Sequence, residues 1–377
     1  MIPGLVSVII PTYNRSDYLR EAVESVFAQT YPLIEVLIID DGSSDAGAHT
    51  KSALKRYLSP DSLSPQMPKV TYLYQKNSGL VSAVNRGLGL ARGEYIQRLD
   101  DDDRLLPEKI SRSVEVFQSC PEVGLVATGY HHINAVGQRI RTCPPRSCPE
   151  STRLLNMLMG SISACAGVMV RSLVHQKVGV YRDIKAQDYE MWVRIAKEFK
   201  VQTIDLPLAE YRQHPGSSIN IKHNRAKMER DILNFTDEQI KSTPLDELIP
   251  NLQSRPHAHA LRAAVYLQQD GKYARGTPLA KAELERADQL APNDPLLQLW
   301  QGVLAVHEGA KIPQNEDLPS LYREQVETLA HFGEERKRLA AHGMSPSSPE
   351  AVNLRRRFGR FRSKLLRQTF KAAVGKQ

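Results

Sequence analysis

The sequence predicts an α/β fold in which a mostly parallel sheet has helices on both faces, followed by a region of helices alone. Three observations predict it. Short apolar runs alternate with amphipathic segments over the first 120 residues, several runs end in polar residues, and strand-like runs stop near residue 221. Such alternation is typical of parallel sheets with crossover helices. The 377 residues are enough for one large domain and a smaller one.

The elements of the first 120 residues follow from hydrophobic periodicity. The apolar run 6–10 ends at Pro11 and predicts a buried strand. The next segment predicts a helix with one apolar face, formed by Leu19, Ala22, Val23, Val26 and Phe27. Ligands of parallel sheets bind beyond the carboxyl ends of the strands. We expect further strands at 33–39, 70–74 and 94–99, and helices from near residue 44, at 79–91 and at 107–119.

Residues 120–220 are less regular, but we still expect strands near 125–126, 167–170 and 201–204 and a helix at 189–197. The stretch 154–170 has no charged residue over seventeen positions. Polar residues and Gly160 interrupt it, so we expect a short helix, a turn and a buried strand rather than a membrane span.

The rest of the chain predicts helices separated by prolines. Segments 261–271 and 297–309 look like related helical units, and the region between them, with Ala280 and Ala287, is similar to the end of a tetratricopeptide helix. This predicts either a tetratricopeptide-like pair that binds a protein partner through 257–309 or a plain helical appendage. We therefore divide the chain into a domain of residues 1–220, a helical region of 221–345 and a tail of 346–377.

Positive charge gathers in the tail. The formal net charge is +8, and removing the nine lysines and arginines of residues 351–377 leaves 41 basic against 42 acidic residues. Leu354, Phe358, Phe361 and Leu365 share one helical face there. A basic amphipathic helix suits an anionic membrane surface, and a solvated helix or an RNA-binding arm are the alternatives.

The compartment is predicted from the cysteines and the first residues. Four cysteines are too few for a disulfide-stapled fold, and none forms a CxxC pair, so we expect a reducing compartment and no zinc cluster. The first residues lack the basic and apolar segments of a signal peptide. We expect a cytoplasmic protein that the tail could attach to the inner face of the membrane.

Four consecutive aspartates, Asp100 to Asp103, follow the expected strand at 94–99. Crowded carboxylates repel one another unless a cation neutralises them. A hard divalent ion takes one or two carboxylates together with phosphate oxygens of a nucleotide. A solvated acidic turn is the alternative, but the position at a strand end favours a metal and nucleotide site.

Polar residues also follow the first two strands and precede a later helix. A carboxylate such as Asp40 can accept a hydrogen bond from a base or a ribose, Tyr13 offers a ring for stacking, and Arg15 a cation for phosphate. Each segment would also suit an ordinary turn or helix cap. The candidate binding residues are Pro11, Thr12, Tyr13, Asn14, Arg15, Asp40, Asp41, Asn77, Gly79, Asp100 and Asp101.

Two later segments carry candidate chemistry. Asp188, at the start of a helix, could be a general base that removes a proton from an acceptor hydroxyl, or simply a helix cap. Arg212 and His214 follow an expected strand exit at Pro207 and could bind a diphosphate or a metal. Such a pair is more often structural.

In their order and spacing these motifs resemble the family 2 glycosyltransferases of the GT-A fold, a Rossmann-like α/β architecture. The likeness covers residues 4–220. It rests on Val-Ile-Ile-Pro-Thr-Tyr-Asn, Ile-Ile-Asp-Asp-Gly-Ser-Ser-Asp, Asn-Ser-Gly, Gly-Glu-Tyr-Ile-x-x-Leu-Asp-Asp-Asp-Asp, Gln-Asp-Tyr-Glu-Met-Trp-x-Arg and Tyr-Arg-x-His.

The resemblance implies a hexosyltransferase-type enzyme that moves a sugar, with inversion, from a nucleotide-diphosphate donor to a glycan or lipid-linked acceptor, using Mg2+ or Mn2+. It implies that Asp102 binds the metal, as part of an Asp100-x-Asp102 element and near His214. It also implies that Asp40 reads the base and that Asp188 is the catalytic base. Pro11, Tyr13 and Arg15 would lie along the nucleotide, Asp101 near the ribose, and Gly167 in the acceptor-side strand.

Two residues depart from the family's pattern. Gln187 replaces the usual acid before the base, and Val84 stands where many members have arginine. Two other function classes stay open. A nucleotidyltransferase would need a glycine-rich phosphate loop, which Pro11 to Arg15 lacks, and a non-catalytic scaffold would bind a partner through its helices.

Overall fold

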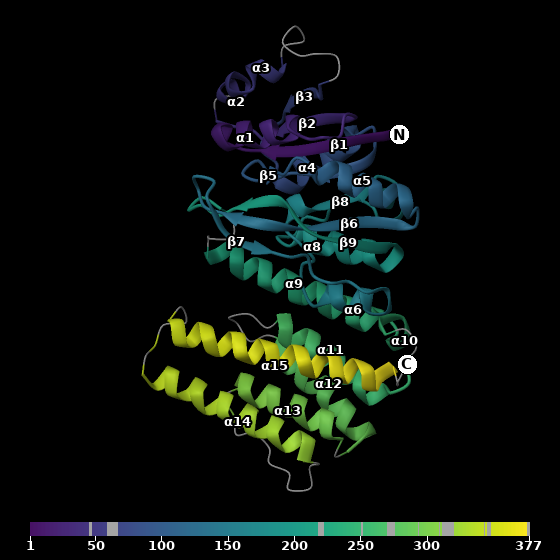
Figure 1. Cartoon of the computed structure of the whole chain (residues 1–377), viewed down its shortest axis with the longest axis vertical. Helices are drawn as coiled ribbons and strands as arrows, with labels where there is room; N and C mark the ends of the chain where they lie inside the picture. The colour runs from purple at the N-terminus through teal and green to yellow at the C-terminus, as the bar shows by residue number, and fades with distance from the viewer. Residues whose placement is uncertain are drawn as a thin grey trace. The chain divides into compact units, whose positions relative to one another are not determined.

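The computed structural model describes residues 1–44, 47–58, 67–217, 222–249, 252–269, 276–292, 294–308, 310, 320–342, 344 and 348–374. Two compact units divide the chain, Met1–Asp231 and Ile232–Gln377, and the boundary falls within helix α9 (Lys222–Ser242) (Figure 1).

Unit 1 is built around a nine-stranded sheet with the order β3-β2-β1-β4-β8-β6-β9-β5, in which β7 pairs with β6. The first four strands run parallel, β8 is antiparallel to both of its neighbours, and β9 runs parallel to β6. The strands are β1 (Ile2–Thr12), β2 (Ile34–Asp40), β3 (Lys69–Tyr74), β4 (Gly93–Arg98), β5 (Arg104–Leu105), β6 (Val123–Ile133), β7 (Arg139–Cys143), β8 (Val168–Arg171) and β9 (Lys200–Arg212). The predicted α/β fold is confirmed, with a sheet that is parallel in one half and mixed in the other.

Helices cover both faces of the parallel half. Val8 of β1 lies in a core with Leu19, while its neighbour Ile9 faces the other side of the sheet. There Gly87 lets the helix approach closely, because an added Cβ would come 2.5 Å from Ile9 Cγ2. The helices of unit 1 are α1 (Ser16–Phe27), α2 (Ala48–Ala53), α3 (Lys55–Leu58), α4 (Leu80–Leu90), α5 (Lys109–Ser119), α6 (Arg153–Leu158), α7 (Val174–Val178), α8 (Gln187–Glu198) and the part of α9 up to Asp231.

Several predicted bounds change. The expected strand at 201–204 is far longer, because β9 continues past Pro207 to Arg212 with a register shift near the proline, so the predicted strand exit is wrong. The helix expected from residue 44 begins at Ala48, and residues 45–46 lie outside the described residues. Two strands have no counterpart among the predicted elements: β5, which has two residues, and β7, whose residues are mostly exposed.

The uncharged stretch 154–170 forms α6, a 3-10 turn at Cys165–Gly167 and buried β8, as predicted. Gly167, expected in a strand, lies in that turn just before β8. Among the described residues, no helix is both long and apolar enough to cross a membrane. All four cysteines are free thiols.

Unit 2 contains only helices in its described parts. Helix α11 packs against α12 and α15, and α13 packs against α14 and α15. Ala280 and Ala287 are both fully buried, whereas Gly271 and Gly309, the last residues of the two predicted helical units, lie outside the described residues. The tetratricopeptide likeness stays a prediction. The helices are α10 (Leu245–Leu248), α11 (Arg255–Gln269), α12 (Gly276–Leu290), α13 (Pro295–Glu308), α14 (Ser320–Ala341) and α15 (Pro349–Val374).

The tail helix α15 is part of this bundle. Leu354 and Leu365 are buried, and Trp300 of α13 donates a hydrogen bond to Thr369 at 2.8 Å. The ring of Phe361 lies 6.1 Å from that of Phe332 in α14. The predicted apolar face is therefore packed within unit 2, and attachment of the basic tail to a membrane surface stays a prediction.

Lys109 of α5 is buried without a carboxylate partner among the described residues. Its side chain is fully shielded, and Nζ donates to Ser113 Oγ at 3.1 Å. Burial lowers the pKa of the Lys109 ammonium to about 7. In the unfolded chain this pKa returns to its usual value near 10.5, so above about pH 7 the unfolded state binds more protons than the folded state.

We therefore expect Lys109→Met to raise the free energy of unfolding at neutral pH, because it removes a buried charge. The advantage over wild type should shrink as the pH rises from about 7 to about 10, since folded Lys109 is neutral over that range and the cost of removing its proton falls as the pH nears the unfolded pKa. Urea unfolding at several pH values measures it, with exposed Lys55→Met as the control. A constant difference across the range would contradict the assignment.

Candidate active site

The four aspartates lie beyond the carboxyl end of β4, each in a different environment. Asp101 and Asp103 are buried, while Asp100 and Asp102 keep intermediate exposure. Burial and the neighbouring Asp102 charge raise the pKa of Asp101 to about 7, and Arg15 opposes the rise. Burial also raises the pKa of Asp103, whose Oδ2 has no partner in the described part of the chain. The run is a site of unfavourable negative charge.

Asp102 is contacted by residues from both the beginning and the end of unit 1. Arg15 Nη1 donates to Asp102 Oδ2 at 2.9 Å and to Asp101 Oδ1 at 3.1 Å. His214 Nε2 lies 3.0 Å from the same Asp102 oxygen, and Arg212 Nε donates to the Asp102 carbonyl at 2.8 Å. The structure thus brings together Arg15, Asp102, Arg212 and His214.

The end of β1 also reaches the acid run. Thr12 Oγ1 donates to Asp101 Oδ2 at 2.8 Å, and Pro11 is buried beside it in the strand. Tyr13 is 48% exposed, so its ring surface is open, as stacking on a base requires.

Asp40 connects β2 to β3 and to its own loop. Its Oδ1 accepts the Ser43 N–H at 2.9 Å, and its Oδ2 accepts the Tyr72 hydroxyl at 2.7 Å. Ser43 in turn accepts the Asn14 N–H at 3.0 Å, and Asn14 Oδ1 accepts the Ser44 N–H at 2.9 Å. Asn14 takes the left-handed conformation, with φ of 53°, that asparagine tolerates better than most residues.

Asp41 holds the loop before α4. Its Oδ1 accepts the Ser78 N–H at 2.9 Å and the Gln75 amide at 2.7 Å, and its Oδ2 accepts the Gly79 N–H at 2.8 Å. Asn77 is exposed between these contacts. The structure therefore brings Asp41 and the Asn77–Gly79 loop together, with the carboxylate oxygens engaged by the protein itself.

Asp188 lies in the first turn of α8, which begins at Gln187. The residue in the N-cap position is Ala186, so the helix-cap alternative for Asp188 is wrong by two positions. Asp188 Oδ1 accepts the Tyr189 N–H at 2.8 Å. Burial raises the pKa of the Asp188 carboxyl, and the nearby Arg98 charge opposes the rise.

Arg98, the last residue of β4, is not among the predicted site residues, and its side chain is 4% exposed. Its Nε and Nη2 donate to Asp100 Oδ1 at 3.0 and 2.9 Å. With the Gln187 amide turned to satisfy both of its atoms, Arg98 Nη1 donates to the Gln187 oxygen at 3.2 Å. The available signal was a charged residue at the end of an expected buried strand, because a buried guanidinium needs partners.

Comparison with known proteins identifies the family. The sequence model of glycosyl transferase family 2 matches residues 7–176. The putative teichuronic acid biosynthesis glycosyltransferase TuaG of Bacillus subtilis is 31% identical over 226 residues, which cover 59% of this chain and 84% of TuaG. The chain belongs to glycosyl transferase family 2.

Two further likenesses extend over more of the chain. An uncharacterized glycosyltransferase of Rickettsia conorii is 30% identical over 287 residues, which cover 73% of this chain but only 44% of that relative. The chain thus spans less than half the length of this relative. The crystal structure of S. aureus TarS with UDP-GlcNAc superposes with a TM-score of 0.53 at 16% identity, covering 90% of this chain and 92% of TarS. The GT-A fold is confirmed.

The site of this family 2 chain fits a divalent cation only in part. Within the described ranges, no three histidine, cysteine or acidic side chains are arranged to hold a metal by themselves. Asp102 and His214 supply one oxygen and one nitrogen close together, and Asp100 adds a half-exposed carboxylate. This donor set suits a Mg2+- or Mn2+-type ion that takes one or two protein ligands and completes its shell with phosphate oxygens.

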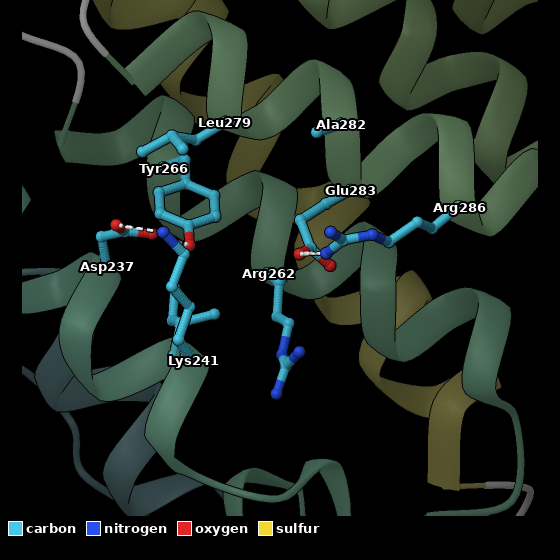
Figure 2. A pocket seen from close by; sticks show the side chains of 9 residues that line it. Asp237, Lys241, Arg262, Tyr266, Leu279, Ala282, Glu283 and Arg286 are labelled. Atoms are coloured by element: carbon cyan, nitrogen blue, oxygen red, sulfur yellow. Dashed lines mark hydrogen bonds and ion pairs between the residues drawn. The ribbon is translucent and has the colours of Figure 1, made fainter.

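A cavity of about 220 Å3 lies in unit 2 and shares no residue with this site (Figure 2). Asp237 at its edge bonds to Lys241 at 2.7 Å and to the Tyr266 hydroxyl at 2.9 Å, and Glu283 pairs with Arg286 at 2.6 Å. The acidic charges of its wall are therefore already paired within unit 2.

We expect Asp41→Ala to lower the free energy of unfolding by about 1–2 kcal/mol, because two part-buried backbone N–H groups lose their acceptor. Urea unfolding gives the change, and limited proteolysis should show faster cleavage at residues 77–79. Asp183→Ala, an exposed position, is the control. Equal stability of the two variants would show that Asp41 does not hold the loop.

Proposed function

We propose that the chain is an inverting, metal-dependent glycosyltransferase that moves a hexose from a nucleotide-diphosphate sugar to a hydroxyl acceptor. The observation that carries the proposal is one connected set of contacts. Asp102 meets Arg15 and His214, and Arg98 links Asp100 to the helix of Asp188. Membership of family 2 supports the same reaction. The name of TuaG supports an acceptor in a cell-surface polysaccharide, with glycolipid and glycoprotein acceptors as alternatives.

On the donor side, Asp102, with Asp100 and His214, would hold Mg2+ or Mn2+. When bound, this ion supplies positive charge that stabilises the leaving diphosphate. Tyr13 would stack on the base, and Arg15 would lie beside the diphosphate. The other predicted donor-site residues, Pro11, Thr12, Asn14, Asp40, Asp41, Asn77, Gly79 and Asp101, would shape the nucleotide pocket directly or hold its loops.

On the acceptor side, Asp188 would take the proton of the attacking hydroxyl. A new bond forms between the acceptor oxygen and the anomeric carbon while the bond from that carbon to the phosphate oxygen breaks. One displacement from the opposite face inverts the anomeric configuration. A carboxylate whose pKa is raised by burial is a stronger base than an exposed one, which suits this role.

We expect Asp102→Ala and Asp188→Asn each to abolish sugar transfer while the fold survives. The two variants should differ in their affinity for UDP or GDP with Mn2+. Asp102→Ala should weaken this binding because Asp102 would contact the donor, whereas Asp188→Asn should leave it unchanged because Asp188 would contact the acceptor. Nucleotide release in a donor screen with Mn2+ measures turnover, and calorimetry with UDP or GDP plus Mn2+ measures binding. Asp183→Asn is the exposed control.

Full transfer activity in either variant would remove that residue from the mechanism. The alternative of a non-catalytic scaffold, with a protein partner on 257–309, would be favoured if wild type bound no nucleotide with Mn2+ and released none with any donor. A nucleotidyltransferase is disfavoured because the loop after β1 has no glycine-rich phosphate cradle.

We also propose that the protein works in the cytoplasm, at the inner face of a membrane, and attaches through charge rather than through an apolar face. Five exposed cations of α15 step by four, four, three and four residues and so share one side of the helix. Within the described residues they form no ion pair. Near an anionic bilayer each cation contributes about 1 kcal/mol. The five are Arg356, Arg360, Lys364, Arg367 and Lys371.

We expect wild type to pellet with phosphatidylglycerol vesicles and not with phosphatidylcholine vesicles, and the binding to weaken with salt because exposed charges are screened. Replacing the five cations by glutamine should abolish pelleting. A matched variant that replaces Arg20, Lys51, Lys55, Arg56 and Lys69 of unit 1 should pellet as wild type does. Equal pelleting of both variants, or binding of RNA in place of vesicles, would contradict membrane attachment.

A further inference from the structure

Arg98 connects the two sides of the proposed reaction site. It ends β4, two residues before the acid run, and its guanidinium is almost wholly shielded from solvent. Two of its nitrogens bond to Asp100, and the third bonds to Gln187 in the first turn of α8. The next residue of that turn is Asp188. One planar cation therefore bridges a strand end and a helix start that lie about ninety residues apart in the sequence.

The surroundings of Arg98 leave it little freedom. The Tyr181 ring lies 5.7 Å from the guanidinium carbon, and Tyr181 is tied to Asn85 of α4 by two hydrogen bonds, at 2.9 and 3.0 Å. The Gln187 amide nitrogen donates to the carbonyls of Ile184 and Lys185 at 3.1 and 2.9 Å. The same amide thus closes the turn before α8 and accepts from Arg98.

Resting on the proposed function, we propose that Arg98 is a positioning residue that fixes Asp188 relative to the acid run. A buried guanidinium with all three nitrogens engaged holds both partners in one plane, which a flexible side chain cannot do. A displacement of about 1 Å in a reacting group can cost about a hundredfold in rate. The position of Asp188, and of the helix that carries it, relative to the bound donor would therefore depend on this bridge.

The bridge also explains why glutamine suits position 187. A neutral amide accepts from Arg98 without cancelling its charge, so the guanidinium still offsets the charges of Asp100 and Asp188. An acid at 187 would compete with both carboxylates for the same cation. Arg98 and Gln187 form a matched pair in this chain.

The test separates the two ends of the bridge. Gln187→Ala removes only the α8 end. Arg98→Lys keeps a charge for Asp100 but cannot reach both partners, and Arg98→Gln removes both links. We expect the first two to lower kcat for sugar transfer about tenfold to a hundredfold and to leave the affinity for UDP plus Mn2+ unchanged. Arg98→Gln should lower kcat further and also weaken UDP–Mn2+ binding.

The control is Arg171→Gln. Arg171 is equally buried, bonds to Glu94 and to the Val123 carbonyl, and lies opposite Tyr95, at the start of β4 rather than its end. Its loss should reduce thermal stability about as much as Arg98→Gln while kcat per folded molecule stays at the wild-type value. That comparison distinguishes positioning from general destabilisation.

Wild-type kcat in Arg98→Gln, or equal loss in Arg171→Gln, would overturn the inference. If Arg98→Gln fails to fold, the Arg98→Lys and Gln187→Ala variants still test the inference, because each keeps a cation beside Asp100. Wild-type kcat in both of them would overturn it. If wild type transfers no sugar from any donor, the proposed function fails instead. Even then, unchanged UDP–Mn2+ affinity in Arg98→Gln would count against the Asp100 end of the bridge.

Discussion

The rest of the unit 1 structure depends on how four adjacent carboxylates are accommodated at one strand end. Without compensation, their mutual repulsion and burial would favour protonation or unfolding. All four carboxylates have hydrogen-bond partners in the fold, and Arg15 serves two of them: Arg98 bonds to Asp100, Thr12 and Arg15 to Asp101, Arg15 and His214 to Asp102, and the Arg212 N–H to Asp103.

These donors come from distant parts of the chain, so the site requires the whole sheet. The loop after β1 supplies Arg15, β4 supplies Arg98, and the end of β9 supplies Arg212. β1 and β4 are neighbours, whereas β9 reaches the acid run only because it continues past Pro207 and pairs with β5. The length of β9, which local sequence did not predict, is thus what completes the charge balance.

Much of the site could be predicted from sequence because its acids stand at strand ends. Parallel strands bring their carboxyl ends to one edge, so strand positions alone predict that Asp40 and Asp102 lie at that edge. The partners of each acid could not be predicted in the same way. The Asp41 carboxylate accepts hydrogen bonds from the loop before α4, and Arg98 bonds to Gln187 of α8. Both contacts depend on packing between segments far apart in sequence.

The tail shows the same limit in a different form. Periodicity correctly placed Leu354 and Leu365 on one face of a helix, but period alone does not say what covers that face. In the structure Thr369 accepts from Trp300, and the apolar side of α15 belongs to unit 2. What is left for a partner is the cationic side, and a surface without exposed apolar side chains binds reversibly and in a salt-dependent way.

The compensation in the acid run also suggests how donor binding would be favourable. Arg15 holds Asp102 and Asp101 and bonds to the Gly216 carbonyl, so it is paired with protein acceptors throughout. A diphosphate with its cation would bring both a new positive charge for Asp102 and a new anion for Arg15. The protein would then exchange one set of charge pairs for another rather than expose a charge. Arg98 is fully engaged and buried, so it would keep its contacts through that exchange and hold the base side of the site unchanged while the donor side rearranges.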